Sequence, residues 1–160
     1  MDTDTPAVRD VAASHRFDED GLARYLASRI DGFGRLASVQ QFQGGASNPT
    51  FLLVAEGADG PRRFVLRKKP PGQLLASAHQ VEREYRIAAA LQAVGFPTAP
   101  MRHLCEDAAI IGTAFYVMDY LPGRIFRDAT LAGLQPAERT AIYDELNARL
   151  AQLHQIDWRA

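Results

Sequence analysis

The short connection EGADGP, residues 56–61, constrains the fold of this chain more than any other feature. It separates two stretches rich in strand-forming residues, TFLLVAEG (50–57) and RRFVLRKK (62–69). Asp-Gly pairs adopt the positive φ angles that tight turns between antiparallel strands require, and Asp59-Gly60 lies at the centre of this connection. The sequence therefore predicts a β-hairpin between these two stretches.

The segments before the hairpin predict one more strand and one helix. LASVQQF (36–42) has strand character, so residues 36–69 are expected to form a three-stranded antiparallel meander. Residues 17–30 carry apolar side chains at helical spacing, with Asp18 or Asp20 placed to cap the helix. Residues 1–16 have no such pattern, and we expect a flexible tail.

The segments after the hairpin predict one helix followed by two strands. Residues 82–94 have helical spacing, and Gly95 with Pro97 would end that helix. MRHLCED (101–107) and TAFYVMDYL (113–121) are the two strand candidates. This order predicts an α+β fold with a five-stranded, mostly antiparallel sheet and one inserted helix.

A second long helix is predicted near the end of the chain. Pro136 suits the first turn of a helix, where its missing N–H costs nothing. Four apolar residues then recur every three or four positions: Ile142, Leu146, Leu150 and Leu153. This spacing predicts a buried stripe along the helix.

Composition excludes several classes of function. The chain has 160 residues, of which 47% are hydrophobic and 23% charged, and its net charge of −1 gives no reason to expect nucleic-acid or membrane binding. No segment approaches the length of a membrane span, and the acidic start does not resemble a secretory signal. The single cysteine, Cys105, fits a reducing compartment, so we expect a cytoplasmic protein.

The stretch FVLRKKPPG (64–72) places three cations at the end of a strand. Alternate strand residues share a face, so Val65 and Arg67 should point one way and Lys68 the other. On the next helix, Glu84 lies three, four and seven positions before Ile87, Ala88 and Leu91, which places it on the apolar face. A buried cation needs a partner, so we predict an ion pair between Arg67 and Glu84.

We assign no functional site to the remaining charged side chains, to the cysteine or to the histidines. Lys68 and Lys69 are expected at a solvated strand end without a fixed partner. Glu82 and Arg83 lie outside the apolar stripe of their helix and are expected in solvent. Cys105 is predicted to be a core residue. His15, His79 and His103 have no ligand spacing with Cys105 or with one another, so we predict no metal site from them.

The loop FQGGASNPT (42–50) connects the first two predicted strands. Gly44 and Gly45 allow the backbone to approach a ligand closely, and Ser47 and Asn48 offer short hydrogen-bonding side chains. Such a loop can cover phosphates, although most glycine pairs are only turns. The later Arg67 and Glu84, in that order, strengthen the phosphate interpretation.

Several blocks together resemble a known family. FQGGASNPTFLLVAEG, FVLRKKPPGQLLASAHQVEREYRIAAAL, FPTAPMRHLCED, IGTAFYVMDYLPGRIF and LAQLHQIDW are similar to the amino-terminal half of the aminoglycoside phosphotransferase family, in the branch associated with acyl-CoA dehydrogenases. The resemblance covers about residues 36–158. It implies a protein-kinase-like fold, with a nucleotide-binding N-lobe over 17–121 and the hinge exit and the start of a truncated C-lobe over 122–160.

The resemblance also implies which residues bind the nucleotide. Arg67 stands where kinases place a phosphate-binding lysine, and Glu84 is its partner on the helix. The loop residues expected over the phosphates are Gly44, Gly45, Ser47 and Asn48. The residues expected around the purine are the apolar side chains of Val65 and Met118 and the hinge backbone of Asp119, Tyr120 and Leu121.

The activity implied is transfer of phosphate from ATP or GTP, with Mg²⁺, to a hydroxyl group of a small molecule. The family's catalytic and metal-binding aspartates have no counterpart in these residues, and we expect them beyond Ala160. His154 precedes that catalytic loop and does not replace it. A hydroxyacyl-CoA or another metabolite is as reasonable an acceptor as an antibiotic. The competing hypothesis is a non-catalytic, pseudokinase-like nucleotide-binding or interaction module; continuation of the reading frame into the catalytic motifs would favour the enzyme.

Overall fold

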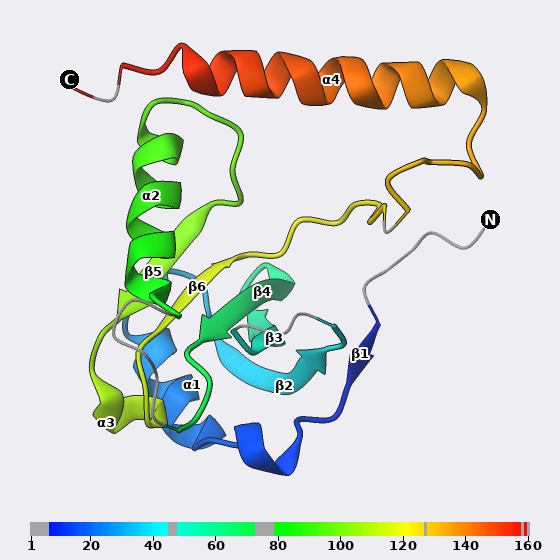
Figure 1. Cartoon of the computed structure of the whole chain (residues 1–160). Coiled ribbons are helices and arrows are strands. Elements are labelled where there is room, and N and C mark those ends of the chain that lie inside the picture. The colour runs from blue at the N-terminus through cyan, green and yellow to red at the C-terminus, as the bar shows by residue number, and fades with distance from the viewer. Residues whose placement is uncertain (1–6, 45–47, 73–78, 127, 158, 160) are drawn as a thin grey trace.

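An antiparallel sheet organises the chain (Figure 1). The computed structural model describes residues 7–44, 48–72, 79–126, 128–157 and 159. The strand order is β1-β2-β3-β4-β6-β5, and every neighbouring pair is antiparallel. The strands are β1 Val8–Arg9, β2 Arg35–Phe42, β3 Thr50–Gly57, β4 Gly60–Lys68, β5 Met101–Cys105 and β6 Phe115–Asp119. The predicted α+β fold is confirmed, with one strand more than the five expected.

The β3–β4 hairpin is present, with its turn one residue earlier than expected. Gly57 pairs with Gly60, so Ala58 and Asp59 form the turn and Gly60 already belongs to β4. Gly60 has a φ of 103°, a backbone angle that residues other than glycine rarely adopt. The glycine therefore absorbs the positive φ at the return into the second strand.

Four α-helices and one 3₁₀ turn accompany the sheet in the described residues. They are η1 Ala13–His15, α1 Glu19–Ala27, α2 Val81–Ala93, α3 Ala108–Ile111 and α4 Pro136–His154. Asp18 is the cap of α1, because its carboxylate accepts a hydrogen bond from the Gly21 N–H at 2.9 Å. Pro136 opens α4 as predicted. The short helix α3 was not predicted.

The main core lies between one face of the sheet and the helices α1 and α3. Leu22 and Leu26 of α1 are fully buried in it. The sheet contributes large side chains from three central strands, namely Phe51, Leu53, Phe64, Leu66, Phe115 and Val117. Cys105 is also buried there, as predicted.

The opposite face of the sheet carries a smaller cluster beneath α2. Val81, Ala114 and Tyr116 are buried in it, and Tyr85 and Met118 pack against them. Figure 1 shows α2 beside β5 and β6, with α1 on the other side of the sheet. The two faces therefore differ in how much apolar side chain they bury.

Part of the predicted N-terminal tail is attached to the sheet. Val8 pairs with Phe42 and Arg9 with Gln41, and the Ala12 N–H donates to the Gln41 side-chain oxygen at 3.1 Å. A two-residue strand is too short to show a periodic pattern, which is why the sequence suggested no structure there. Residues 1–6 lie outside the described part of the chain.

Three of the four residues in the apolar stripe of α4 are exposed, contrary to the expected burial, and Ile142 is partly buried. Leu146 is 60% exposed, and Leu150 and Leu153 are exposed as well. In Figure 1, α4 stands apart from the sheet and comes near α2 only at one end, where Leu91, Leu153, His154 and Ile156 line a pocket of about 390 Å³. Among the described residues, the stripe therefore lacks most of the partners that its spacing implies.

No helix in the described residues has the length and apolarity needed to cross a bilayer.

Candidate functional site

A row of apolar side chains crosses four strands on the α2 face of the sheet. Val65 pairs with Leu52 on one side and with Met118 on the other, and Met118 pairs in turn with Met101. Directly paired residues point to the same face, so these side chains form one apolar strip. The structure thus brings Val65 and Met118 together, as expected for two walls of a purine site.

A polar row lies two residues along the same strands. Arg67 pairs with Thr50 of β3 and with Tyr116 of β6. The Arg67 guanidinium donates a hydrogen bond to the Thr50 hydroxyl at 3.4 Å. An apolar strip next to a polar row that contains the cation Arg67 suits a ligand with a flat apolar end and an anionic end.

The predicted ion pair between Arg67 and Glu84 is confirmed. Arg67 Nε lies 2.9 Å from Glu84 Oε2. The buried Nε–H is not aligned with a hydrogen-bond acceptor, so this contact is an ionic one. The two side chains are 32% and 37% exposed. The pair is accessible to a ligand, and partial exposure keeps its own contribution to stability small.

Glu84 is held by two further side chains. Its Oε1 accepts a hydrogen bond from Asn48 Nδ2 at 2.9 Å, and its Oε2 accepts one from the Tyr116 hydroxyl at 3.2 Å. Asn48 Oδ1 in turn accepts from His79 Nδ1 at 3.0 Å. Burial, and then the Glu84 charge, raise the pKa of Tyr116 to about 12. We call these five residues, His79, Asn48, Glu84, Tyr116 and Arg67, the Glu84 cluster.

The glycine loop is only partly within the described residues. Gly44 has a φ of 89°, a conformation that requires glycine in practice. Gly45 and Ser47 lie outside the described part, so their predicted roles remain predictions. Asn48 is 5% exposed and uses both ends of its amide inside the protein. The structure therefore favours a supporting role for Asn48 over direct contact with phosphate.

The predicted hinge leaves one backbone donor available. The Asp119 N–H donates to the Pro100 carbonyl at 2.9 Å, and the Tyr120 N–H donates to the Arg63 carbonyl at 3.2 Å. The Leu121 N–H has no hydrogen-bond acceptor among the described residues, and Leu121 is exposed. Of the three hinge residues, Leu121 is the one placed to donate to a ligand.

The Asp119 side chain is used within the protein. Its carboxylate accepts from Arg102 Nε at 2.8 Å and forms a second contact with the same guanidinium. A bidentate pair of this kind is directional. Asp119 therefore braces β6 against β5.

Two expectations about neighbouring charges were wrong. Lys69 forms an ion pair with Glu82, and the two side chains are only partly exposed, at 26% and 18%. Burial alone would raise the pKa of Glu82, but the hydrogen bond from Lys69 and its charge lower it. The path of the chain brings the first turn of α2 back to the end of β4, which helical spacing alone does not show.

Lys68 was also expected in solvent and is 5% exposed. It lies on the α1 face, with Nζ 5.7 Å from the centre of the Phe17 ring. No carboxylate within the described ranges pairs with it, and burial lowers its pKa. Strand alternation correctly puts Lys68 on the face opposite Arg67, the face of Leu66, but it does not show that the core covers that face up to the end of β4.

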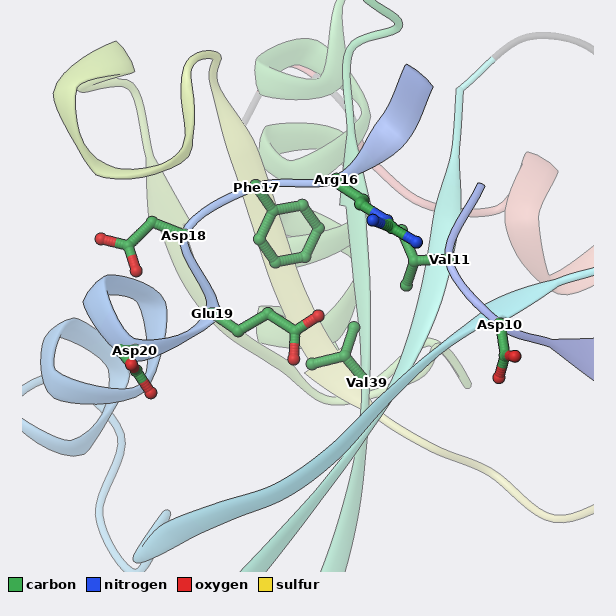
Figure 2. Close-up of a pocket in the computed structure, with 8 residues that line it drawn as sticks. All are labelled: Asp10, Val11, Arg16, Phe17, Asp18, Glu19, Asp20 and Val39. Atoms are coloured by element: carbon green, nitrogen blue, oxygen red, sulfur yellow. The ribbon is translucent and has the colours of Figure 1, made fainter. Parts of the chain in front are cut away.

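A separate pocket of about 680 Å³ lies on the α1 side of the sheet (Figure 2). Figure 2 shows the Phe17 ring and Val39 at its centre, with acidic side chains around them. The residues that line it are Asp10, Val11, Arg16, Phe17, Asp18, Glu19, Asp20 and Val39. Asp18 is already used to cap α1. Within the described ranges, no group of three or more His, Cys, Asp or Glu residues could hold a metal ion.

The fold and the Arg67–Glu84 pair are those of a protein-kinase-like module, and comparison with known proteins agrees. The model of a phosphotransferase enzyme family matches residues 38–160. The chain therefore belongs to this phosphotransferase family. The crystal structure of a putative aminoglycoside phosphotransferase from Ralstonia eutropha superposes with a TM-score of 0.75 at 44% identity, covering 90% of this chain and 40% of that one.

Curated relatives carry the names of acyl-CoA dehydrogenases. The chain is 45% identical over 152 residues to acyl-CoA dehydrogenase family member 11 of Homo sapiens, covering 92% of this chain and 19% of that protein. It is 45% identical over 154 residues to the probable acyl-CoA dehydrogenase IBR3 of Arabidopsis thaliana, covering 94% of this chain and 19% of that protein. The chain thus spans about a fifth of the length of these relatives.

Proposed function

We propose that this chain forms the nucleotide-binding part of an enzyme that transfers the γ-phosphate of ATP or GTP to a hydroxyl group of a small molecule. The observation that carries the proposal is the position of Arg67. Its side chain points to the same face as the apolar strip of Val65 and Met118 and is paired with Glu84. This is the arrangement that a phosphate-binding cation needs beside a purine site.

The chain's own residues would bind and orient the nucleotide. The base would lie on Val65 and Met118, with its edge accepting a hydrogen bond from the Leu121 N–H. The phosphates would then reach Arg67, whose planar guanidinium can contact two phosphate oxygens at once. Holding the nucleotide in one orientation is a large part of catalysis in phosphoryl transfer.

Magnesium would neutralise charge on the transferred phosphate when bound. The described residues contain no group of three or more His, Cys, Asp or Glu that could hold a metal ion, so we assign no metal ligand to this chain. The family's catalytic aspartate has no counterpart in this sequence, so we assign no catalytic base to it either. We expect both from residues beyond Ala160.

The acceptor class and the compartment are further parts of the proposal. Relatives named as acyl-CoA dehydrogenases make a hydroxyacyl-CoA the first acceptor to test. Other hydroxylated metabolites and aminoglycosides come next. Cys105 is buried and unpaired, which suits a reducing compartment, so we propose a cytoplasmic protein without a nucleic-acid or membrane partner.

Calorimetric titration with Mg·ATP and Mg·GTP tests the nucleotide site. We expect binding by the chain and at least tenfold weaker binding by Arg67→Ala, which corresponds to ~1.4 kcal/mol. Arg24→Ala, which removes an exposed arginine of α1, is the matched control and should bind normally. No binding by the wild type, or equal binding by Arg67→Ala, would disprove the proposal.

Transfer to an acceptor tests the catalytic part of the proposal. The full-length natural protein is incubated with labelled ATP or GTP and a hydroxyacyl-CoA, and phosphorylated product is measured. Nucleotide binding without transfer to any hydroxyl acceptor would favour the alternative, a pseudokinase-like nucleotide-binding or interaction module.

A further inference from the structure

The side-chain amide of Asn48 joins two segments that meet beside the candidate phosphate site. Its Nδ2 donates to Glu84 Oε1 at 2.9 Å, which requires that Oδ1 faces His79. Because Oδ1 can only accept, His79 Nδ1 must carry the proton in this 3.0 Å contact. The amide therefore has one orientation, and the buried Asn48 has both polar atoms satisfied.

Tyr116 holds the same carboxylate from the strand side. Its hydroxyl donates to Glu84 Oε2 at 3.2 Å, the oxygen that also lies 2.9 Å from Arg67 Nε. Both oxygens of Glu84 are thus engaged by groups from separate elements, Asn48 just before β3 and Tyr116 on β6. A carboxylate held at both oxygens has little freedom to rotate.

The backbone of His79 supports the same conclusion. Its φ is 58°, which is unusual for a residue that is not glycine and costs energy. Such a conformation persists only where the surroundings impose it. The contact between the His79 ring and Asn48 is one of the interactions that hold the His79 backbone in this conformation.

We infer that Asn48, His79 and Tyr116 are positioning residues that fix Glu84, and through Glu84 hold the Arg67 guanidinium ready for nucleotide phosphate. This inference rests on the proposed function. Asn48 lies in the last part of the glycine loop, just before β3, so its bond to Glu84 also ties this end of the loop to α2. Asn48 and Arg67 are thereby joined through Glu84 before any nucleotide arrives, which lowers the ordering cost of binding.

The substitution Asn48→Asp tests this inference with almost no change in shape. It replaces the Nδ2 donor by an oxygen that faces Glu84 Oε1, so two carboxylates repel each other at high pH. Two close carboxylates raise the pKa of the pair, and at low pH a shared proton restores the hydrogen bond. The other groups that face this pair are His79, Arg67 and Tyr116.

We expect Asn48→Asp to bind Mg·ATP or Mg·GTP at least tenfold more weakly than the wild type at pH 8. The ratio of the two dissociation constants should fall towards one as the pH is lowered to about 5.5. Asn147→Asp, at the exposed asparagine of α4, is the matched control and should keep a ratio near one at every pH.

A tenfold loss that does not recover at low pH would mean that Asn48 is merely structural, and it would overturn the inference. A ratio near one at pH 8 would overturn it as well. Tyr116→Phe is the second variant, because it removes only the hydroxyl and leaves the ring packed. It should weaken nucleotide binding about threefold with an unchanged circular-dichroism spectrum, and unchanged binding would remove Tyr116 from the inference.

A measurement without nucleotide separates this inference from the proposed function. The exchange of the Arg67 Nε–H with water is followed by ¹⁵N NMR at pH 8. We expect exchange to be at least fivefold faster in Asn48→Asp than in the wild type and unchanged in Asn147→Asp. Equal exchange in all three proteins would disprove the positioning role. Failure of the wild type to bind either nucleotide would disprove the proposed function instead.

Discussion

Two adjacent cations at the end of β4, Arg67 and Lys68, lie in opposite environments. Arg67 is on the α2 face, about a third exposed and paired with Glu84. Lys68 is on the α1 face, almost fully buried, with the Phe17 ring as its neighbour. One residue along a strand therefore separates a cation that is available to a ligand from one that is enclosed by the fold.

The same contrast holds for the two faces of the whole sheet. The α1 face buries the aromatic residues Phe51, Phe64 and Phe115 completely. The α2 face has a smaller core and carries the Glu84 cluster. The α1 face mainly supplies stability, whereas the α2 face combines packing with the polar groups that a ligand would meet.

The largest expected effect tests this division between the faces. Phe64→Ala removes a fully buried ring from the α1 face and should lower the free energy of unfolding by about 3–5 kcal/mol. Val65→Ala on the α2 face removes less apolar area and should cost about 1.5 kcal/mol. Urea unfolding measures both values.

Nucleotide titration of the same two variants completes the comparison. Val65→Ala should weaken nucleotide binding, whereas Phe64→Ala should leave the affinity of the folded fraction unchanged. A larger loss of stability in Val65→Ala than in Phe64→Ala, or a larger loss of affinity in Phe64→Ala, would contradict these separate roles of the two faces.

The second prediction concerns the hinge at the edge of the α2 face. Leu121→Pro removes the one hinge N–H that has no acceptor among the described residues, and nucleotide binding should weaken about tenfold, or ~1.4 kcal/mol. Leu121→Ala keeps the N–H and is the matched control. Asp119→Ala should change the affinity by less than tenfold, because the Asp119 side chain pairs with Arg102. Calorimetry decides, and a larger effect of Asp119→Ala would place that carboxylate in the site.

The smallest expected effect compares the two lysines next to Arg67. Burial lowers the pKa of Lys68 in the folded protein, so the unfolded chain binds more protons at alkaline pH. Stability from this group should therefore rise as the pH increases towards the unfolded pKa of ~10.4. Lys68→Met should raise the free energy of unfolding at pH 7 and reduce this alkaline rise.

Lys69→Met is the matched control for Lys68→Met. It breaks the pair with Glu82 and should lower stability by about 1 kcal/mol or less. Urea unfolding at pH 7 and pH 9.5 measures both variants. A loss of stability in Lys68→Met at pH 7 would show that the Phe17 contact outweighs the cost of burial.

Local patterns in the sequence were sufficient to predict the five longer strands, the three longer helices and one side-chain contact. The Asp-Gly turn and its flanking strands predicted the β3–β4 hairpin to within one residue. The strand period at Val65 and Arg67, combined with the helical position of Glu84, predicted the Arg67–Glu84 pair. Ile87, used in that helical argument, is exposed, so the face of α2 was placed only approximately.

Other features depend on where distant segments meet. Periodicity shows which face a side chain takes, but the partner on that face depends on loop paths and on neighbouring elements. For this reason the sequence alone did not show that Lys69 meets Glu82 or that Asn48 links His79 to Glu84. The exposed stripe of α4 illustrates the same limit, because an apolar period predicts that a partner is needed and not that one is present. The sequence by itself thus determined the longer strands and helices, their order and the cation that faces Glu84, whereas only the tertiary structure decided how that carboxylate is held.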